Sequence, residues 1–444
     1  MSMTAIQDRE VGAVRLRRPD RSQVVMTVQC PDDLISAKHP ARLVWQVVQT
    51  LDLSAFCAPI KAREGVCGRD ATDPALLVSL WLYATIRGIG SAREVARLCV
   101  ESTPYRWLCG DLDPLNHHTL GDFRVGHGAA LDELFTRLIA TLVGQGLVKV
   151  SRISQDGTRV RACAGSSSFR RKERLKKLLA EAAEQVRQVK ALLDDPASSA
   201  GLGAKRKAAK RRAAREREER VARAIAQLPE LEKRQAKLAK KVSTKDKHKG
   251  KLKEPRASTT DADARVMKMP DGGFRPAVNM QFATDTQSRA IVGVEVVNQG
   301  VDTGQAQPMR QQVERRSGGE VSEHLMDGGY LVLEEIERAE GEGVTLYVPP
   351  KPPRNKAKRG SEYEPRPDDS EEVKRWRQRM GSEQGQTIYK ERAATSETVN
   401  ADGKTHRGLG RLTVRGVPKA RCVALWFALA YTLMHFGPHL IGSS

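Results

Sequence analysis

The sequence predicts an α/β protein, in which a mixed sheet flanked by helices follows an all-helical N-terminal domain and is interrupted by a basic helical-hairpin insertion. Three observations lead to this fold class. Residues from about 40 to 145 carry only helix signals, strand patterns begin near residue 148 and resume near 277, and a basic helical stretch lies between them. The chain has 444 residues, which suits two or three domains.

Charge and composition restrict the class of partner. The net charge is +21, from 75 Lys and Arg against 54 Asp and Glu, and a protein this basic usually binds a polyanion. The N-terminus lacks the apolar segment of a secretory signal, and the apolar run 422–434 is too short to span a bilayer. We therefore expect nucleic acid and no membrane partner. Seven scattered cysteines without a Cys-x-x-Cys pair favour a reduced chain without zinc.

The N-terminal helical region contains a helix, a glycine turn and a second helix. Asp73 and Pro74 begin the first helix as N-cap and first-turn residue, and the run 75–87 is apolar enough to be buried. After the glycine turn, Ser91 and Glu94 have the spacing of a capping box. This pattern fits a helix-turn-helix and a plain helical hairpin equally well. Nearby arginines tilt the choice toward DNA: Arg93, Arg97, Arg106 and Arg124.

The insertion spans residues 169–255 and reads as two helices. Leucines and valines keep helical spacing on both sides of a turn at 195–203, which predicts a helical hairpin or coiled coil. Pro229 is expected to kink the second helix. The Lys and Arg runs at 205–207 and 210–212 are either a solvated face or a surface for the phosphate backbone of DNA.

Five strands are expected in the remaining sequence, at 148–154, 277–284, 289–297, 323–326 and 344–348. Helices are expected at 303–316, 331–340, 370–397 and 419–435, the last broken by Gly437-Pro438. Without the insertion, three strands can form an antiparallel meander, and two more follow through helical crossovers as parallel neighbours. This is the strand order of an RNase H-like fold. Its first and fourth strands lie side by side, so Asp156 and Asp327, expected at their ends, would meet.

These two aspartates suit metal-dependent phosphodiester chemistry. Mg²⁺ prefers carboxylate oxygens, and two such ions can stabilise the attacking and leaving oxygens of an in-line displacement. Each aspartate is followed by glycine, which allows close approach of the backbone and DNA. Taken singly, Asp-Gly is more often a turn dipeptide. The matching positions of both pairs in the predicted topology favour the metal-site interpretation.

Several motifs resemble those of DDE transposases from bacterial insertion sequences, and the resemblance runs from about residue 38 to 437. The segments that carry it are Arg106–Gly110 and His118–Arg124 in the N-terminal region, Asp156–Ala162, Ser258–Lys268 with Asp271–Phe274, Met326–Tyr330, Tyr389–Arg392, Glu397–Asn400, Arg407–Arg411 and Val414–Gly416. Each motif is moderately specific, and their order together is strongly specific.

The resemblance implies roles for individual residues. Asp156, Asp327 and Glu397 match the catalytic, metal-binding acids of the family, with Mg²⁺ as the expected ion and Mn²⁺ as its substitute. Tyr389 and Arg392 match a pair that contacts the phosphate near the cut. Lys404, seven positions after Glu397, matches a DNA-contacting lysine in some relatives. The gap from Arg392 to Glu397 is one residue longer than in the best-known form of the signature, and Glu391 competes for the third acid.

The implied activity is cleavage at the ends of a DNA element and transfer of the freed 3′-hydroxyl into target DNA. The expected partners are the terminal inverted repeats, target DNA and a second copy of the chain in a homodimer, and the expected location is the nucleoid in the bacterial cytoplasm. The sequence contains no Gly-x-x-x-x-Gly-Lys phosphate-binding loop, so ATP use is not expected. The alternatives are a stand-alone metal-dependent DNA nuclease and a non-catalytic DNA-binding regulator derived from a transposase.

The expected domains follow from these assignments. Residues 1–37 are a disordered or extended segment, 38–145 a helical DNA-binding domain, and 146–168 with 256–437 the RNase H-like catalytic domain. Residues 169–255 form the insertion, and 438–444 a tail.

Overall fold

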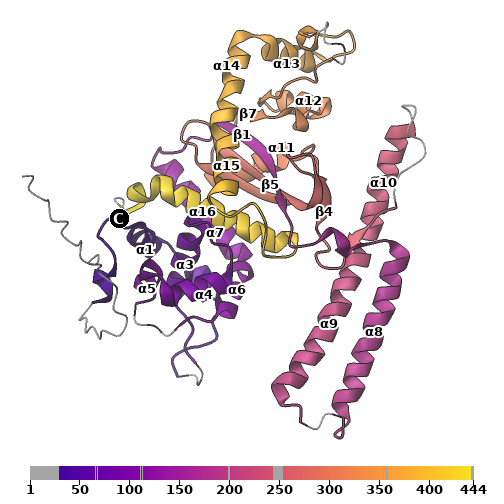
Figure 1. Cartoon of the computed structure of the whole chain (residues 1–444). Helices are drawn as coiled ribbons and strands as arrows, with labels where there is room; N and C mark the ends of the chain where they lie inside the picture. Colours follow the sequence, from indigo (N-terminus) through magenta and orange to yellow (C-terminus); the bar gives the residue numbers. More distant parts are fainter. Residues whose placement is uncertain are drawn as a thin grey trace, which may run out of the picture.

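The computed structural model describes residues 30–441 except 66, 68, 111, 113, 199–200, 244–253, 354 and 356–358. Most of the expected N-terminal segment and the last three residues of the expected tail therefore lie outside the described residues. The N-terminal region is helical (Figure 1), with η1 (Pro31–Leu34), α1 (Pro40–Thr50), α2 (Ser54–Cys57), α3 (Pro74–Ile86), α4 (Ala92–Glu101), α5 (Thr103–Cys109), α6 (His117–Gly126) and α7 (Gly128–Gly144).

The N-terminal helices begin where capping residues predict. The Asp73 side chain accepts a hydrogen bond from the Ala75 amide at 2.8 Å and starts α3, which is buried almost all round. Ser91 accepts from the Glu94 amide at 3.4 Å and starts α4. The Glu94 side chain bonds Arg97 on the same helix, so only the serine half of the expected capping box is formed.

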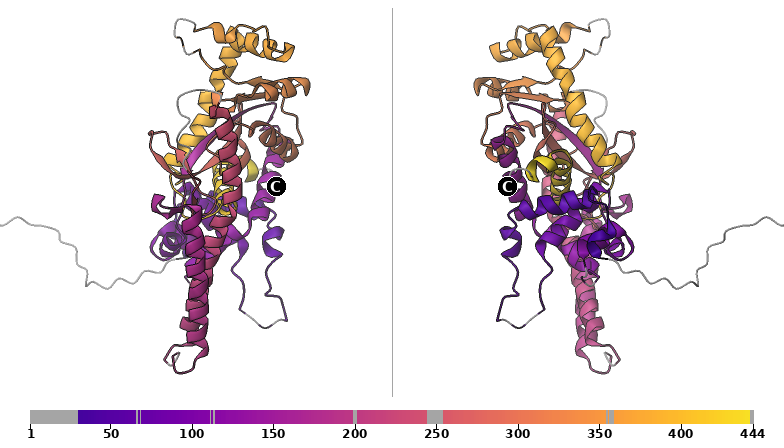
Figure 2. Two further views of the ribbon diagram at one scale, coloured as in Figure 1. Left: turned by 90° about the vertical axis from the view of Figure 1, so that its right-hand side faces the viewer. Right: turned by 90° about the vertical axis from the view of Figure 1, so that its left-hand side faces the viewer.

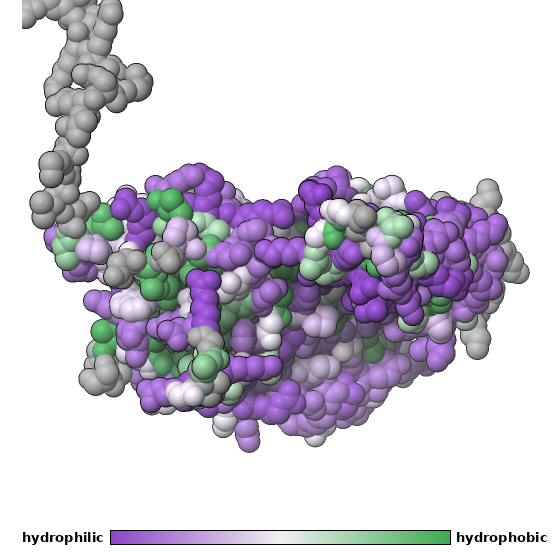
Figure 3. Space-filling model, turned by 90° about the horizontal axis from the view of Figure 1, so that it is seen from below, coloured by the Kyte–Doolittle hydropathy of each residue, from purple (hydrophilic) through white to green (hydrophobic). Residues whose placement is uncertain are grey.

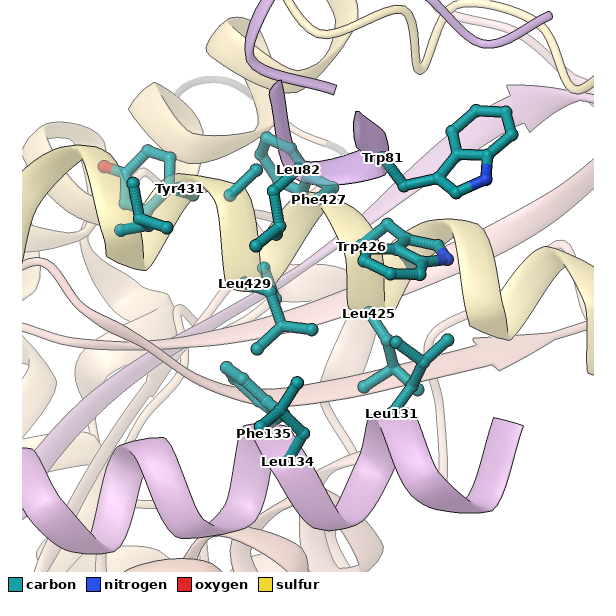
Figure 4. Close-up of a cluster of buried hydrophobic side chains, with 14 of the residues drawn as sticks. Trp81, Leu82, Leu131, Leu134, Phe135, Leu425, Trp426, Phe427, Leu429 and Tyr431 are labelled. Atoms are coloured by element: carbon teal, nitrogen blue, oxygen red, sulfur yellow. The ribbon is translucent and has the colours of Figure 1, made fainter. Parts of the chain in front are cut away.

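The long helix α16 (Val417–Ile441) joins the N-terminal helices to the sheet. It packs against α1, α3, α6 and α7 of the N-terminal region and against β5 and β6 of the sheet. Figure 4 shows Trp426 and Phe427 of this helix beside Trp81 of α3, with Leu131 and Phe135 of α7 below. By length and composition α16 could cross a membrane, but most of it is buried inside the protein. It is therefore the core helix of one continuous hydrophobic core.

The expected break of this helix at Gly437-Pro438 was wrong, because α16 continues through Pro438 to Ile441. Gly437 lies against the Leu43 side chain of α1, and Phe436 and Leu440 are buried. Packing against α1 keeps the last turn helical, and residues 438–441 belong to the core helix rather than to a tail.

The main sheet has six strands in the order β4-β5-β1-β7-β8, with β6 beside β4 on the same edge of β5. Strand β1 pairs antiparallel with β5 and parallel with β7, and β8 is parallel to β7. The strands are β1 (Arg152–Arg161), β4 (Arg265–Lys268), β5 (Phe274–Asp285), β6 (Ile291–Val297), β7 (Glu323–Met326) and β8 (Thr345–Tyr347); β2 (Phe169–Arg170) and β3 (Ala257–Ser258) form a separate pair. The five expected strands are present, whereas β2, β3 and β4 were not expected.

Strand β1 starts and ends later than expected. Val150 has a left-handed φ of 51°, so the chain bends before the strand and β1 begins at Arg152. Pairing with β5 continues to Arg161, which places Asp156 inside the strand rather than at its end. Pairing with β7, by contrast, stops at Gln155. Pairing with β7 is therefore absent at Asp156, and among the described residues the next bridge of β1 outside β5 is the parallel one between Arg161 and Arg411.

Helices cover both faces of the sheet. Side chains alternate along β1, so Ser154 and Asp156 point to one face and Gln155 points to the other. The first face carries α16 and a turn whose Ser396 hydroxyl bonds that of Ser154 at 2.8 Å. The second face carries the start of α11, where Gln155 donates to the Gln305 carbonyl at 3.3 Å. The remaining elements are α11 (Ala306–Ser317), η3 (Gly328–Tyr330), α12 (Leu333–Gly341), η5 (Ser361–Tyr363), α13 (Glu371–Gly381), α14 (Glu383–Arg392), η6 (Ala393–Glu397) and α15 (Thr398–Thr405).

The insertion forms an arm that projects from the body of the protein (Figure 2). Helices α8 (Lys172–Asp194) and α9 (Ala204–Ala226) run side by side as the expected hairpin, around a small apolar cluster that includes Leu175 and Val221. Pro229 does not kink a continuous helix. Instead α9 ends at Ala226, and Pro229 lies in the first turn of α10 (Leu228–Ser243), where its missing amide costs nothing.

Candidate catalytic site

Two carboxylates meet where β1 and β7 run side by side. In the parallel register Gln155 lies opposite Met326, so the next residues along the two strands are Asp156 and Asp327. The Asp327 side chain accepts a hydrogen bond from the Gly329 amide at 2.8 Å, which fixes it at the start of the short turn η3. The two aspartates are 171 positions apart in sequence and are adjacent at the unpaired edge of β1.

Asp156 is largely enclosed and held by polar neighbours. Its Oδ2 accepts from the Asn400 Nδ2 at 2.9 Å, its Oδ1 accepts from the Gly157 amide at 3.0 Å, and Arg392 Nη1 lies 3.8 Å from Oδ1. Burial raises the pKa of the Asp156 carboxyl to about 6, while Arg392 opposes that rise and the Asp327 charge adds to it. The pKa of about 6 indicates a carboxylate for which a nearby positive charge would be favourable.

Arg392 connects Glu397 to this pair of aspartates. Arg392 Nη2 donates to Glu397 Oε1 at 2.5 Å while its Nη1 faces Asp156, so one guanidinium lies between both carboxylates. The Glu397 side chain is 50% exposed, unlike that of Asp156 at 18%. In this conformation, and within the described residues, no three acidic, histidine or cysteine side chains converge closely enough to hold a metal ion.

A π-helical turn explains how Arg392 and Glu397 face one another. Helices α14 and α15 are continuous through η6, and its residues Ala393–Glu397 are π-helical. A π-turn inserts one residue into an α-helix and pairs positions i and i+5 instead of i and i+4. The extra residue between Arg392 and Glu397 is therefore absorbed here, and the two side chains still lie on one face.

Glu391, the competing acid, points elsewhere. Its carboxylate accepts from Arg152 Nη1 at 2.9 and 3.2 Å. Arg152 is at the start of β1, a full four residues before Asp156, and it also pairs with Glu323 of β7. Glu391 thus links α14 to the start of β1, away from Asp156.

Tyr389 and Lys404 lie on the two sides of Glu397 along the same helical segment. The Arg392 guanidinium lies 5.9 Å from the centre of the Tyr389 ring. Burial raises the pKa of Tyr389 and lowers that of the half-buried Lys404, and the charge of Asp156 partly offsets the change at Lys404. Both residues are therefore close enough to the acidic pair to share its electrostatic field.

The N-terminal arginines have different surroundings. Arg93 is exposed on α4. Arg97 is also exposed, but it bonds Glu94 at 2.6 Å and pairs with Glu101 on its own helix. Arg124 is only 7% exposed, stacks 4.7 Å above the Trp81 ring and donates to the Gly90 carbonyl and the Thr413 hydroxyl. DNA contact by Arg124 would require it to leave these internal partners.

The side chains at this edge suit a hard divalent cation. Asp156 and Asp327 offer carboxylate oxygens, and the enclosed Oδ1 of Asn400 has no hydrogen-bond partner among the described residues. The Asp156 pKa shows that a compensating charge is favoured there, and Arg392 supplies one in this conformation. The two aspartates and the Asn400 oxygen therefore fit a magnesium-type ion, whereas Glu397 is bonded to Arg392 in this conformation.

Two polar residues at the site were not expected from the sequence. Asn400 was noted only as part of a motif, although its spacing of three from Glu397 places it one helical turn away on the same side. Asp302 follows β6 in an unremarkable Val-Asp-Thr sequence and lies against Gly157. No sequence signal identifies Asp302, because its position depends on how β5 pairs with β1.

Comparison with protein families gives two matches. Residues 29–125 match a family described as a transposase domain (DUF772), and residues 254–433 match the transposase DDE domain. The second range contains Asp327 and Glu397, whereas Asp156 lies before the insertion and joins the site through strand pairing. No curated protein and no solved structure matches the chain.

Proposed function

This chain belongs to the transposases with a DDE catalytic domain, and we propose that it cuts DNA at the ends of a mobile element and joins those ends to target DNA. Its activity is DNA transposition, and proteins of this class bind DNA and use divalent metal ions. The observation that supports the detailed proposal most is the adjacency of Asp156 and Asp327 at the unpaired edge of β1.

We assign the residues as follows. Asp156, Asp327 and Glu397 would hold Mg²⁺, for which Mn²⁺ would substitute, and a metal held there would supply stabilisation of negative charge in phosphodiester displacement. Asn400 orients the Asp156 carboxylate. Arg392 exchanges Glu397 for a DNA phosphate, and Tyr389 packs beside it. Lys404 contacts DNA beyond the cut, and exposed Arg93 on α4 contacts the terminal repeat.

We further propose that the sheet is RNase H-like and that two copies of the chain bring the element ends together. The sheet order, with β1 between an antiparallel β5 and a parallel β7, supports the first point. The need to hold two DNA ends supports the second. A location at the nucleoid in the bacterial cytoplasm follows from the DNA substrate.

A joining assay tests this function. Purified protein is incubated with a labelled terminal-repeat duplex, a supercoiled plasmid and an excess of Mg²⁺. The expected result is cleavage at the repeat end followed by covalent joining of its 3′ strand to the plasmid. Cleavage without joining would indicate a nuclease, and binding without cleavage in Mg²⁺ or Mn²⁺ would indicate a regulator.

The arm is proposed as a second DNA surface. The first half of α9 carries seven basic residues and no acid: Lys205, Arg206, Lys207, Lys210, Arg211, Arg212 and Arg215. Three basic residues on α8 pair with acids on their own helix: Arg174, Lys176 and Arg187. Of the α9 residues, Arg211 pairs with Asp194 of α8. Viewed from below, hydrophilic side chains cover most of the visible face (Figure 3). The end of the arm therefore presents concentrated positive charge to a phosphate backbone.

Charge removal on α9 should reduce the salt dependence of DNA binding. In the triple variant Arg206→Ala, Lys210→Ala, Arg212→Ala, the slope of log affinity against log salt should fall by up to about 0.9 for each DNA phosphate that the variant no longer neutralises. The slope is measured by fluorescence anisotropy at several salt concentrations. The matched control removes three arm charges that are paired on α8: Arg174→Ala, Lys176→Ala, Arg187→Ala. Equal slopes for both triples would exclude the arm as a DNA surface, and a change of molar mass instead would assign it to dimerisation.

A further inference from the structure

Asp302 is a buried carboxylate on the second face of the sheet, directly behind Asp156. It lies between β6 and α11, and its Oδ1 accepts from Asn279 Nδ2 and Gln281 Nε2, both at 2.7 Å. A side chain at Gly157 would bring its Cβ into collision with this oxygen. The glycine after Asp156 therefore makes room for Asp302 and Gln281.

The groups around Asp302 are hydrogen-bond donors. The Gln281 Oε1 accepts from the Tyr330 hydroxyl and from Gln155 Nε2, so the Gln281 amide must turn its Nε2 toward Asp302. Two amide donors thus converge on Oδ1, and Arg159 Nη2 lies 3.9 Å from Oδ2. These contacts fix the position of the Asp302 carboxyl group inside the protein.

The second oxygen of Asp302 lies on the side of Asp327. A Cβ atom added at Gly329 would lie 3.4 Å from Asp302 Oδ2 and 2.8 Å from Asp327 Oδ1. The carboxylates of Asp302 and Asp327 therefore border the same small space. The strand edge is open at this point, because β7 stops pairing with β1 at Gln155. The Tyr330 ring lies near all three carboxylates. Burial, followed by the charges of Asp302, Asp156 and Asp327, raises the pKa of the Tyr330 hydroxyl.

Buried oxygens without donors lie on both sides of these carboxylates. Among the described residues, the Oδ1 atoms of Asn400 and Asn279 have no hydrogen-bond partner, although both residues are at least nine-tenths buried. Asn400 bonds Asp156 through its other amide atom, and Asn279 bonds Asp302. Unpaired buried acceptors beside carboxylates are the groups that a cation and its bound water would satisfy.

From this arrangement we propose that Asp302 is a positioning residue of the divalent-cation site, whose carboxylate, with Oδ2 on the side of Asp327, strengthens ion binding at Asp156 and Asp327. The inference rests on the proposed function of those two aspartates. Asp302 acts from outside the ligand set, and carboxylates in such positions commonly change metal affinity by roughly tenfold to a hundredfold.

The test uses the isosteric variant Asp302→Asn in the full-length protein. Its amide oxygen still accepts from Asn279 and Gln281, so the fold is kept while the charge is lost. Isothermal titration with Mn²⁺ should show an affinity at least about tenfold weaker than wild type, with a smaller Mn²⁺-induced rise in Tm. End cleavage should need correspondingly more Mn²⁺ and recover at high concentration.

Two further variants make the outcome unambiguous. Asp302→Ala leaves the Asn279 and Gln281 donors unpaired, so it should lower the metal-free Tm, whereas Asp302→Asn should not. Asp285→Asn changes another buried carboxylate, in the β5–β6 turn, and should leave Mn²⁺ affinity unchanged. Wild-type affinity in Asp302→Asn would overturn the inference and assign Asp302 to structure alone. Absence of Mn²⁺ binding in wild type, or binding that persists in Asp156→Asn, would instead count against the proposed catalytic pair.

Discussion

Asp156→Asn and Asp327→Asn are each expected to lower the rate of end cleavage and strand transfer by roughly 10³-fold. A bound ion contributes several kcal/mol to charge stabilisation in phosphodiester displacement, and about 1.4 kcal/mol corresponds to tenfold in rate. Glu397→Gln is expected to have a similar effect, because Glu397 is the proposed third acid of the metal site. DNA-end binding should remain close to wild type, because none of these changes removes a positive charge.

Glu391→Gln is the matched control for the third acid. Glu391 is on the same helix and has the same chemistry, but it pairs with Arg152 away from Asp156. It should keep cleavage within about tenfold of wild type, since a partly exposed ion pair contributes little stability. Rates come from quenched time courses with saturating Mg²⁺. If Glu391→Gln were inactive and Glu397→Gln active, the third acid would be Glu391, and the assignment of Glu397 would be wrong.

Deletion of Ala394 is expected to keep the enzyme active, whereas insertion of one alanine after Ala394 should abolish cleavage. The deletion removes the extra residue of the π-turn and leaves Arg392 and Glu397 four positions apart, which in an α-helix is again one face. The insertion leaves them six positions apart, which in an α-helix turns Arg392 by about 120° away from Glu397. Tyr389 and Arg392 would then lose their place beside the acidic pair.

Folding and activity are measured on the same preparations. Ala394 is exposed, so neither the deletion nor the insertion removes a buried side chain. Far-UV circular dichroism and Tm report whether the helix persists, and the cleavage assay reports the register. Activity within about tenfold of wild type is expected for the single deletion. Loss of cleavage in the single deletion, with Tm unchanged, would mean that the π-turn itself, and not the facing of Arg392, is required.

The sequence was sufficient to predict the α/β class, the five principal strands and the helical arm, because each has a local pattern. It was insufficient for β2, β3 and β4, which are short strands defined by partners far along the chain. The extent of β1 is a similar case. Its local pattern ends near residue 154, but pairing with β5 carries the strand on to Arg161 and places Asp156 inside it.

Individual residues show the same limit at the site. The adjacency of Asp156 and Asp327 was predictable because parallel strands have a fixed register. The extra residue before Glu397 was visible in the sequence, but its accommodation in a π-turn was not. Arg124 looked like a surface arginine, and only tertiary packing places it over Trp81. Asp302 carried no signal because strand pairing alone brings it to Gly157.

The position of α16 has a consequence for where the DNA is cut. This helix shares one hydrophobic core with the N-terminal helices and with β5 and β6. The helical region and the sheet therefore cannot move independently as domains joined by a flexible linker. If α4 binds the terminal repeat, the fixed distance between α4 and the acidic pair sets the number of base pairs between the recognised sequence and the scissile phosphate. The same core means that a shortened chain ending before Val417 would lack the helix around which its N-terminal half packs, and could not persist as a free-standing competitor for the repeats.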